Sequence, residues 1–223
     1  MQQTPAHDNF NPDLLSLIPT EAKALIDIGC GGGGLMREFK KLNANAHCVG
    51  VDIDPQYLEF ARRYCDSCVN VDIDRADDDF WHAMSDRDCW VFGDALEHLK
   101  NPWEILRKVR NILPEDGCVV ACLPNAQHWS LQAKLSIGDF RYQDSGLLDR
   151  THLRWFTRKT MIEMFQQSGF VLEVGKPRIF NEPNRSKVLP YIRALAKALG
   201  KDEEEAARDA TPLQYVIRVI PKR

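Results

Sequence analysis

An aspartate and a run of glycines near the N-terminus are the first residues in this chain whose types and spacing could do chemistry. The apolar run Ala24–Ile28 contains Asp27, and the glycines Gly29 and Gly31 to Gly34 follow it. Glycine has no Cβ and accepts a positive φ, so a ligand can approach the backbone closely. A helical apolar pattern begins at Leu35, and a helix start offers free N–H groups to an anionic group. The stretch indicates a ligand-binding loop between a strand and a helix.

Two ligand templates fit these glycines. Gly29, Gly31 and Gly34 satisfy the dinucleotide spacing G-x-G-x-x-G. Asp27, Gly29, Gly31 and Gly33 give D-x-G-x-G-x-G, which resembles motif I of the class I S-adenosylmethionine-dependent methyltransferases. A carboxylate at this place would repel a pyrophosphate, but it would attract the ammonium and sulfonium of a methyl donor. The charge favours the methyl donor, and a nicotinamide-dependent oxidoreductase stays as an alternative.

A second acidic residue follows the next predicted strand. Asp52 lies 23 residues after Gly29, directly after the apolar run 46–51. An acid at about this offset holds ribose hydroxyls in nucleotide-binding folds. Pro55 suits the first position of a helix and Asp54 suits its N-cap. We therefore expect Asp52 to be a ribose ligand.

The elements that would position these residues alternate between buried strands and amphipathic helices. This alternation predicts an α/β fold with a Rossmann-like, doubly wound sheet in one domain, residues 1–223. We expect an N-terminal cap helix within residues 1–20, an acceptor lid at 130–156 and a helical insertion at 182–210. The expected strands are 24–28, 46–51, 68–71, 88–92, 118–123, 170–179 and 213–220; the expected helices are 11–18, 34–42, 55–64, 102–113, 161–168 and 188–207.

Composition excludes several classes of protein. The 223 residues carry a net charge of −3 with interleaved signs, which is a poor footprint for nucleic acid. Because there is no long apolar run and no signal-peptide pattern, we expect a cytoplasmic chain without a membrane span. The seven cysteines are odd in number and lie mostly in apolar runs, as reduced buried thiols do. Cys65 and Cys68 have no partner pair at zinc-binding spacing, so we expect no metal.

Further motifs make the resemblance more specific. From about Ala24 to Phe170 the chain is similar to a methyltransferase group rich in bacterial enzymes that act on cell-surface glycans, with kin among methionine-biosynthesis W-type proteins and quinone-type O-methyltransferases. The resemblance implies seven strands, with the last antiparallel between the fifth and sixth, and S-adenosylmethionine as cofactor with S-adenosylhomocysteine as product. The motifs are Leu96-Glu97-His98, Asn101-Pro102-Trp103, Leu113-Pro114-Glu115-Asp116-Gly117, Pro124-Asn125 and Leu147 to Thr157.

The same resemblance implies which residues contact the cofactor. An acid after the third strand would lie against the adenine amino group, and Asp72 matches that position. The predicted cofactor residues are Asp27, Gly29, Cys30, Gly31, Gly33, Asp52, Ile53, Asp72, Ile73 and Asp94.

Three histidines are candidates for a general base. His98, His128 and His152 follow predicted strand ends or lie in the predicted lid, on the side where open α/β sheets bind ligands. His152 is the first choice, because Asp149 and Arg150 beside it could orient the imidazole, and His98 is the second. The alternative is that the segment from Asp149 to His152 only fastens the lid to the sheet.

These observations predict a methyltransferase that O-methylates a sugar or glycan hydroxyl by in-line displacement, assisted by a histidine base. The glycan preference comes from the resemblance alone. A quinol or small-acid O-methyltransferase and a non-catalytic S-adenosylmethionine-binding partner subunit are the alternatives. Arg141, Arg150 and Arg154 would suit a phosphate or carboxylate on the small-molecule or glycan acceptor. The oligomeric state stays open.

Overall fold

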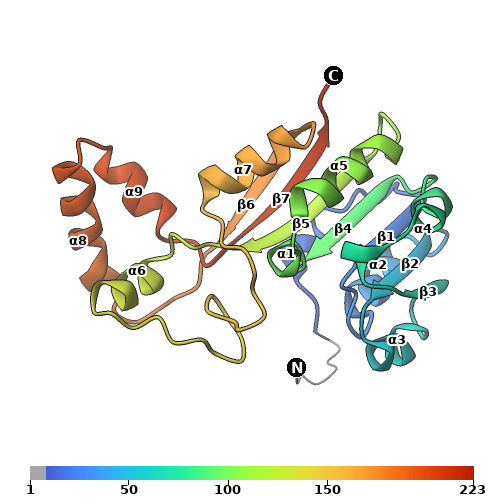
Figure 1. Cartoon of the computed structure of the whole chain (residues 1–223), viewed down its shortest axis with the longest axis horizontal. Coiled ribbons are helices and arrows are strands. Elements are labelled where there is room, and N and C mark those ends of the chain that lie inside the picture. Colours follow the sequence, from blue (N-terminus) through green and yellow to red (C-terminus); the bar gives the residue numbers. More distant parts are fainter. Residues whose placement is uncertain (1–8) are drawn as a thin grey trace.

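A seven-stranded mixed sheet forms the centre of the computed structural model, which describes residues 9–223 (Figure 1). Its strand order is β3-β2-β1-β4-β5-β7-β6, and β7 runs antiparallel to both of its neighbours. The predicted fold, including the antiparallel last strand between the fifth and sixth, is confirmed. The strands are β1 (Ala24–Ile28), β2 (His47–Asp52), β3 (Ser67–Asn70), β4 (Cys89–Gly93), β5 (Cys118–Pro124), β6 (Phe170–Arg178) and β7 (Gln214–Pro221).

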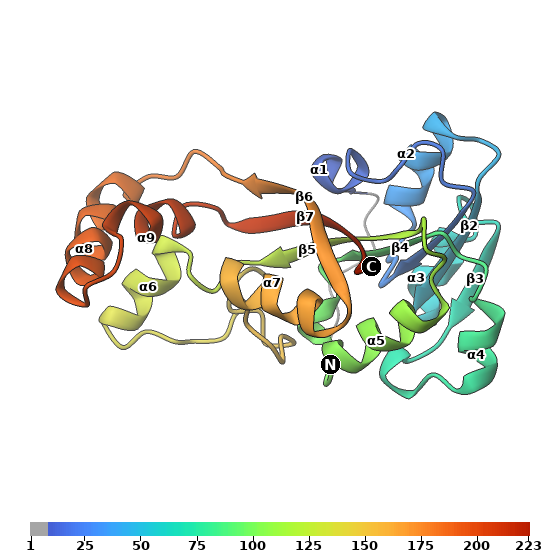
Figure 2. The same ribbon diagram turned by 90° about the horizontal axis from the view of Figure 1, so that it is seen from above.

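Helices cover both faces of the sheet, as the two cores and the view from above show (Figure 2). One face packs against α1 (Pro12–Leu15), α2 (Gly34–Leu42) and α3 (Pro55–Ala61). The opposite face packs against α4 (Asp78–Ala83), α5 (Pro102–Ile112) and α7 (Arg158–Gln167). Strand β4 shows why both faces must be covered. Its Cys89 and Val91 enter one core, and its Trp90 and Phe92 enter the other, as in the buried strands of parallel sheets.

Three further helices form a lobe beside the carboxyl end of β5 (Figure 1). This helical lobe consists of α6 (Trp129–Ser136), α8 (Arg185–Ala198) and α9 (Glu203–Asp209). It has a small core of its own around Trp129, Ile192 and Ala210. The Asn125 side chain, buried at the end of β5, donates 2.8 Å hydrogen bonds to the carbonyls of Asp209 and Pro212 and so anchors the lobe.

Several element predictions need correction. The stretch 188–207, predicted as one helix, is two helices, because Gly200 takes a left-handed φ of +65° in the turn between α8 and α9. The N-terminal helix covers only Pro12–Leu15 instead of 11–18, and residues 1–8 of the expected cap lie outside the described residues. Helices α4 and α6 were not predicted. Helix α4 was missed because its N-cap, Asp77, lies within an acid-rich stretch that was read as a loop. The Asp77 side chain accepts a hydrogen bond from the Phe80 N–H.

Among the helices of residues 9–223, none combines the length and the apolar character needed to cross a bilayer.

Candidate functional site

The glycine loop after β1 is fastened to the end of β2 through Asp52. The Asp52 carboxylate accepts the Gly31 N–H at 2.9 Å through one oxygen and the Asp54 N–H at 2.9 Å through the other. The Gly29 N–H adds a 2.8 Å bond to the Val51 carbonyl. A carboxylate oxygen has two lone pairs, so Asp52 can still accept hydroxyl donors from a ligand. The structure thus places two of the predicted cofactor elements side by side.

The glycines of this loop serve two different purposes. Gly29, Gly31 and Gly33 all have positive φ values, of 75°, 51° and 78°. A Cβ added at Gly31 would meet nothing within 4 Å, whereas one at Gly33 would lie 3.0 Å from the Cα of Ala61. Gly31 therefore borders open space that a ligand could occupy, while Gly33 lets the loop pack against α3.

Asp27 is a buried carboxyl group in the strand that precedes the loop. It is buried in β1, between Gly50 of β2 and Val91 of β4. Burial and, secondarily, the charge of Asp52 raise the pKa of Asp27 to about 8. Both influences disfavour its ionised form, and a positively charged ligand group would offset them. The missing positive partner could be the ammonium or the sulfonium of S-adenosylmethionine. Asp27, Asp52 and the glycine loop would hold this cofactor.

The remaining predicted cofactor residues lie at neighbouring strand ends. Asp72 follows β3 and caps a short 3₁₀ turn by accepting the Asp74 N–H at 3.1 Å. The Ile73 side chain points into the core, so only its backbone could read a ligand. Ile53, beside Asp52, is exposed. Contacts of these residues with an adenosine stay predictions.

Asp94 occupies a special backbone position after β4. Its φ is +55°, a left-handed conformation that few residues other than glycine adopt, although aspartate tolerates it. Its carboxylate accepts a hydrogen bond from the Gln214 side chain on β7. The side-chain amide oxygen of Gln214 in turn accepts a hydrogen bond from the Arg178 guanidinium on β6. A side chain from β7, the next strand but one in the sheet, thus holds this loop, and no sequence pattern indicated Gln214.

Two of the three candidate histidines meet. His98 ends a 3₁₀ turn (Leu96–His98) after β4, and His152 comes from the segment after α6. Their ring centroids are 4.8 Å apart, nearly edge to face. The buried carboxyl of Glu97 adjoins them, with one oxygen 4.0 Å from His152 Nε2. We call these residues the Glu97–His98–His152 cluster.

Main-chain hydrogen bonds bring the two halves of the cluster together. The carbonyl of Glu97 accepts the N–H groups of Leu153 at 2.8 Å and Arg154 at 3.0 Å. This pairing docks the segment that carries His152 onto the turn that carries His98. The segment from Asp149 to His152 is thus fastened to the sheet, while the role of His152 as a base stays a prediction.

Asp149 was expected to orient His152. In the structure it orients His98 instead, through Thr151. Its Oδ1 accepts from the Thr151 hydroxyl at 2.6 Å and from the Thr151 N–H at 2.8 Å. The Thr151 hydroxyl lies 3.1 Å from His98 Nδ1. Arg150, the other expected partner of His152, instead pairs with Asp144.

Burial disfavours the charged forms of Glu97 and His152. It raises the pKa of Glu97 well above its ordinary value, with help from the charge of Asp94. Burial also lowers the pKa of His152, with a smaller contribution from His98. Since both shifts favour uncharged forms, the 4.0 Å contact is not an ion pair. Glu97 Oε2 and His152 Nδ1 are buried and have no hydrogen-bond partner among the described residues.

The same cluster is a donor set of the kind that holds a divalent cation. One ligand atom from each of Glu97, His98 and His152 lies within 4.8 Å of the others. A carboxylate and imidazoles can bind zinc at about 2.0–2.2 Å, so the side chains would have to close around an ion. A bound ion would take imidazole lone pairs that a general base needs, so the two roles exclude each other at any one nitrogen.

His128 lies in a structural network and not with the other two histidines. Its Nδ1 is 2.8 Å from the Ser130 hydroxyl and its Nε2 is 3.1 Å from Glu182, which also accepts from Trp129. The ring is fully buried. These contacts fasten the helical lobe and leave no ring nitrogen of His128 for an acceptor.

The three arginines proposed to bind an anionic acceptor are engaged separately. Arg141 pairs with Asp139 at 2.8 Å, Arg150 pairs with Asp144, and Arg154 donates to the Lys100 carbonyl. No described contact brings them to one point.

An aromatic surface, which sequence reasoning missed, extends from His152. Trp155 lies 6.5 Å from the His152 ring, and Phe140 and Tyr142 lie 6.2 and 6.4 Å from Trp155, centroid to centroid. Phe140 and Tyr142 are exposed. We call Phe140, Tyr142 and Trp155 the aromatic wall. Their scattered positions in an irregular segment gave no periodic signal that could have identified it.

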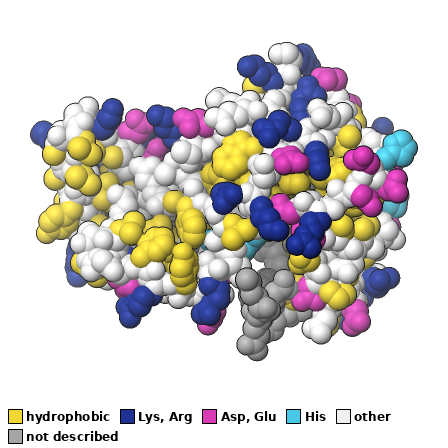
Figure 3. All heavy atoms as spheres, viewed as in Figure 1, with side chains coloured by type: hydrophobic (Ala, Val, Ile, Leu, Met, Phe, Trp, Pro, Cys, Tyr) yellow, Lys and Arg dark blue, Asp and Glu magenta, His cyan; other side chains and the backbone are white. Residues whose placement is uncertain are grey.

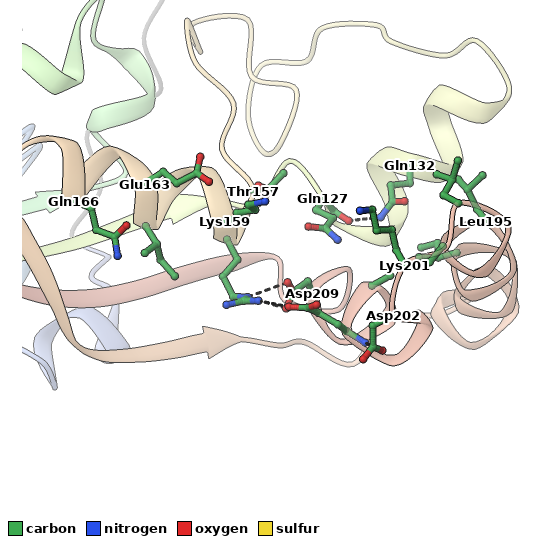
Figure 4. Close-up of a pocket in the computed structure, with 17 residues that line it drawn as sticks. Gln127, Gln132, Thr157, Lys159, Glu163, Gln166, Leu195, Lys201, Asp202 and Asp209 are labelled. Carbon is green, nitrogen blue, oxygen red and sulfur yellow. Dashed lines mark hydrogen bonds and ion pairs between the residues drawn. The ribbon is translucent and has the colours of Figure 1, made fainter.

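A groove of about 680 Å³ opens elsewhere, between α7 and the helical lobe (Figure 4). Gln127, Lys159, Leu195 and Lys201 are among its lining residues. None of the predicted cofactor or catalytic residues lines it. Inside it, the Arg158 Nε lies 2.9 Å from both carboxylate oxygens of Asp209. This ion pair marks the groove as the junction between the lobe and the sheet.

Known proteins are similar to this chain over most of its length. Residues 8–173 match the model of a family described as a methyltransferase domain. A ubiquinone biosynthesis O-methyltransferase from Cereibacter sphaeroides is 30% identical over 176 residues, which are 77% of this chain and 70% of that protein.

Solved structures agree with the fold. An S-adenosylmethionine-dependent methyltransferase from Archaeoglobus fulgidus superposes with a TM-score of 0.64 at 20% identity, covering 94% of this chain and 91% of its own. Magnesium protoporphyrin IX methyltransferase from Synechocystis, solved with bound S-adenosylhomocysteine, gives 0.60 at 11% identity, covering 95% and 80%. Together with the acid and glycine loop at the end of β1, these matches show that the chain belongs to the methyltransferase-domain family and is an S-adenosylmethionine-dependent methyltransferase of the class I fold.

Proposed function

We propose that this enzyme O-methylates an aromatic hydroxyl of the phenol or quinol type, with the His98–His152 pair as the proton acceptor. The observation that carries the proposal is the continuity of this pair with the aromatic wall. A flat acceptor stacked on Trp155 and Tyr142 would present its edge toward His152. The relative named a ubiquinone biosynthesis O-methyltransferase supports the same class of acceptor.

The acidity of the acceptor also favours a phenol over a sugar. A neutral imidazole with a lowered pKa is a weak base, and it removes a proton more easily from a phenol, with a pKa near 10, than from a far less acidic alcohol. The sugar or glycan acceptor expected from the sequence gains no comparable support from the described residues, because Arg141, Arg150 and Arg154 do not converge.

Each part of the site then has a physical task. S-adenosylmethionine, when bound, supplies a methyl group on a positively charged sulfur. The glycine loop, Asp27 and Asp52 bind and orient it, the aromatic wall aligns the acceptor, and His152 or His98 takes the hydroxyl proton. Alignment alone can contribute on the order of 7–11 kcal/mol to such a displacement.

Transfer of a labelled methyl group to a panel of acceptors tests the proposal. We expect turnover of substituted phenols and quinols and none of free or nucleotide-linked sugars. Trp155→Ala should raise KM for the phenol by up to about tenfold, the upper range of one aromatic contact. Tyr191→Ala, an exposed aromatic residue on α8, is the matched control and should change nothing.

Two results would overturn the proposal. Preferred turnover of sugars would make the glycan expectation right. Tight binding of S-adenosylmethionine with no turnover of any class of acceptor would instead favour the non-catalytic partner subunit.

A further inference from the structure

Gln214, the first residue of β7, lies at the same edge of the sheet as the cofactor loop. Strand β7 runs antiparallel to β5, so its first residue and not its last lies beside the carboxyl ends of the parallel strands. Gln214 is paired with Pro124 of β5 on one side and with Arg178, the last residue of β6, on the other. The topology thus brings a β7 side chain to the edge where open α/β sheets bind ligands.

The side-chain amide of Gln214 joins a cation to a carboxylate. Its oxygen accepts from the Arg178 guanidinium, and its nitrogen donates to the Asp94 carboxylate. A guanidinium only donates and an ionised carboxylate only accepts, so one orientation of the amide satisfies both neighbours. Desolvation raises the pKa of Asp94, while the Arg178 charge and the Gln214 hydrogen bond act in the opposite direction. Both contacts therefore favour the carboxylate form.

A further ion pair extends this chain of contacts to α1. The Arg178 Nε lies 3.1 Å from a carboxylate oxygen of Asp13. Figure 3 shows acidic and basic side chains interspersed over the sheet portion, at the centre and right of the molecule, and an exposed pair of this kind ordinarily contributes little to stability. This pair differs because the Arg178 side chain is only 17% exposed and also contacts Gln214. We call Asp13, Arg178, Gln214 and Asp94 the relay.

The loop that the relay holds carries one of the paired histidines. Asp94 has a left-handed φ of +55°, and such a conformation persists only where its surroundings hold it. The chain turns at Asp94 and continues into the 3₁₀ turn that ends at His98. Ala95 lies against the cofactor loop, because a Cβ added at Gly29 would be 3.3 Å from the Ala95 Cβ. A shift at Asp94 would therefore move His98 relative to the bound methyl donor.

We propose that Gln214 is a positioning residue for methyl transfer, which holds the loop after β4 so that the His98–His152 pair faces the methyl donor and the acceptor. This inference rests on the proposed function in that it takes the histidine pair as the proton acceptor. Gln214 contacts Asp94 and neither histidine, so its loss should misalign the reacting groups more than it weakens binding. A misplacement of about 1 Å caused far from the chemistry can lower a rate about 10²-fold.

Kinetics of Gln214→Glu and Gln214→Met test the inference, with S-adenosylmethionine and a phenol as substrates. Both substitutions remove the donor to Asp94. Glutamate keeps an acceptor for Arg178, so Gln214→Glu should fold as the wild type does. We expect kcat to fall about 10- to 100-fold in both variants, with KM for the phenol and Kd for S-adenosylmethionine changed by no more than about threefold. Gln167→Glu, the same change at an exposed glutamine of α7, is the matched control and should leave kcat unchanged.

Hydrogen exchange of the same proteins reports on the loop without any acceptor. The Asp94 N–H donates to the Cys122 carbonyl at 3.2 Å, and the His98 N–H donates to the Ala95 carbonyl at 3.1 Å. These amides should exchange about tenfold faster in Gln214→Glu than in the wild type, because local opening becomes easier. Amides of α2 should keep their wild-type rates.

Two results would contradict the positioning role. One is a wild-type kcat in both Gln214 variants, whatever their exchange rates. The other is a fall in the unfolding temperature and in cofactor affinity as large as the fall in kcat, which would make Gln214 a structural residue only. If the wild type methylates no phenol, the proposed function fails by itself. The exchange rates then decide, and unchanged exchange of the Asp94 and His98 amides would reject the role of Gln214.

Discussion

The imidazole of His152 lies 4.8 Å from that of His98, and the hydrogen bonds that hold the pair in place are made by neighbouring groups. The Glu97 carbonyl docks the segment carrying His152, and Thr151 orients His98. His152 itself keeps Nδ1 without a hydrogen-bond partner among the described residues. In a neutral imidazole one of the two ring nitrogens keeps a lone pair that can accept a proton.

His152→Gln should lower kcat about 10²–10⁴-fold, the usual contribution of a general base, without weakening S-adenosylmethionine binding. Because burial lowers the pKa of His152, the wild-type imidazole is unprotonated at neutral pH. Log kcat should therefore rise with pH only below the ordinary histidine value of about 6.5 and be flat above it. A kcat–pH profile for both proteins, with calorimetry of cofactor binding, measures this. If His152→Gln and His98→Gln both retained full turnover, neither histidine would be the base.

The sequence predicted most of the sheet and much less of the loops. Strands β1, β2, β4 and β5 are short, largely apolar runs with both faces buried, and such runs can be recognised from local sequence alone. The meeting of His98 with His152 was expected, since both belong to the carboxyl-end side of the sheet. The contact between Thr151 and His98 could not be predicted, because it joins residues 53 apart in the sequence and depends on the docking of residues 153 and 154 onto the Glu97 carbonyl. The aromatic wall was missed because its residues are scattered through an irregular segment and show no periodic pattern.

Glu97→Gln should leave the protein folded, with the free energy of unfolding changed by no more than about 1 kcal/mol. The raised pKa of Glu97 means that the wild-type carboxyl tends to the protonated form, which glutamine resembles in size and charge. Glu97→Ala should cost about 2–3 kcal/mol, because it leaves a cavity in a buried site. Urea denaturation of the two variants measures both.

The same pair of variants examines the cation-binding capacity of the cluster. If a divalent ion occupied it, Glu97→Gln would lose a charged ligand and both metal content and activity would fall. Elemental analysis of the purified wild type and Glu97→Gln, alongside turnover with and without a chelator, detects this. With His152 acting as a free base, chelation should leave turnover unchanged.

Asp27 should make the unliganded protein less stable as pH rises. Its pKa is about 8 in the folded chain and 3.8 for an ordinary aspartate. Between these values the folded chain holds a proton that the unfolded chain has released, so the free energy of unfolding falls as pH increases through the window. Asp27→Asn should flatten this slope, as denaturation at a series of pH values would show. An identical slope in both proteins would contradict the assignment.

Cofactor binding should lower the raised pKa of Asp27 in the wild type. A positively charged ligand favours ionised Asp27, so binding near neutral pH should release a proton. Calorimetric titration with S-adenosylmethionine in buffers of different ionisation enthalpy counts the proton. Asp27→Asn should release fewer protons and bind more weakly, whereas Asp54→Asn, at the neighbouring helix cap, should bind nearly as the wild type does.

Gly31→Ala and Gly33→Ala should distinguish the glycine that makes room for the cofactor from the glycine that lets the loop pack against α3. Both positions have positive φ, so each alanine should cost about 1–3 kcal/mol in backbone strain. Gly33→Ala should cost more, because its Cβ would press against the α3 backbone 3.0 Å away. At Gly31 the Cβ would enter open space, so the damage should fall on cofactor affinity. Thermal unfolding and cofactor titration of both variants measure the two effects. A Gly31→Ala enzyme with wild-type affinity would mean that the ligand does not approach the loop at this glycine.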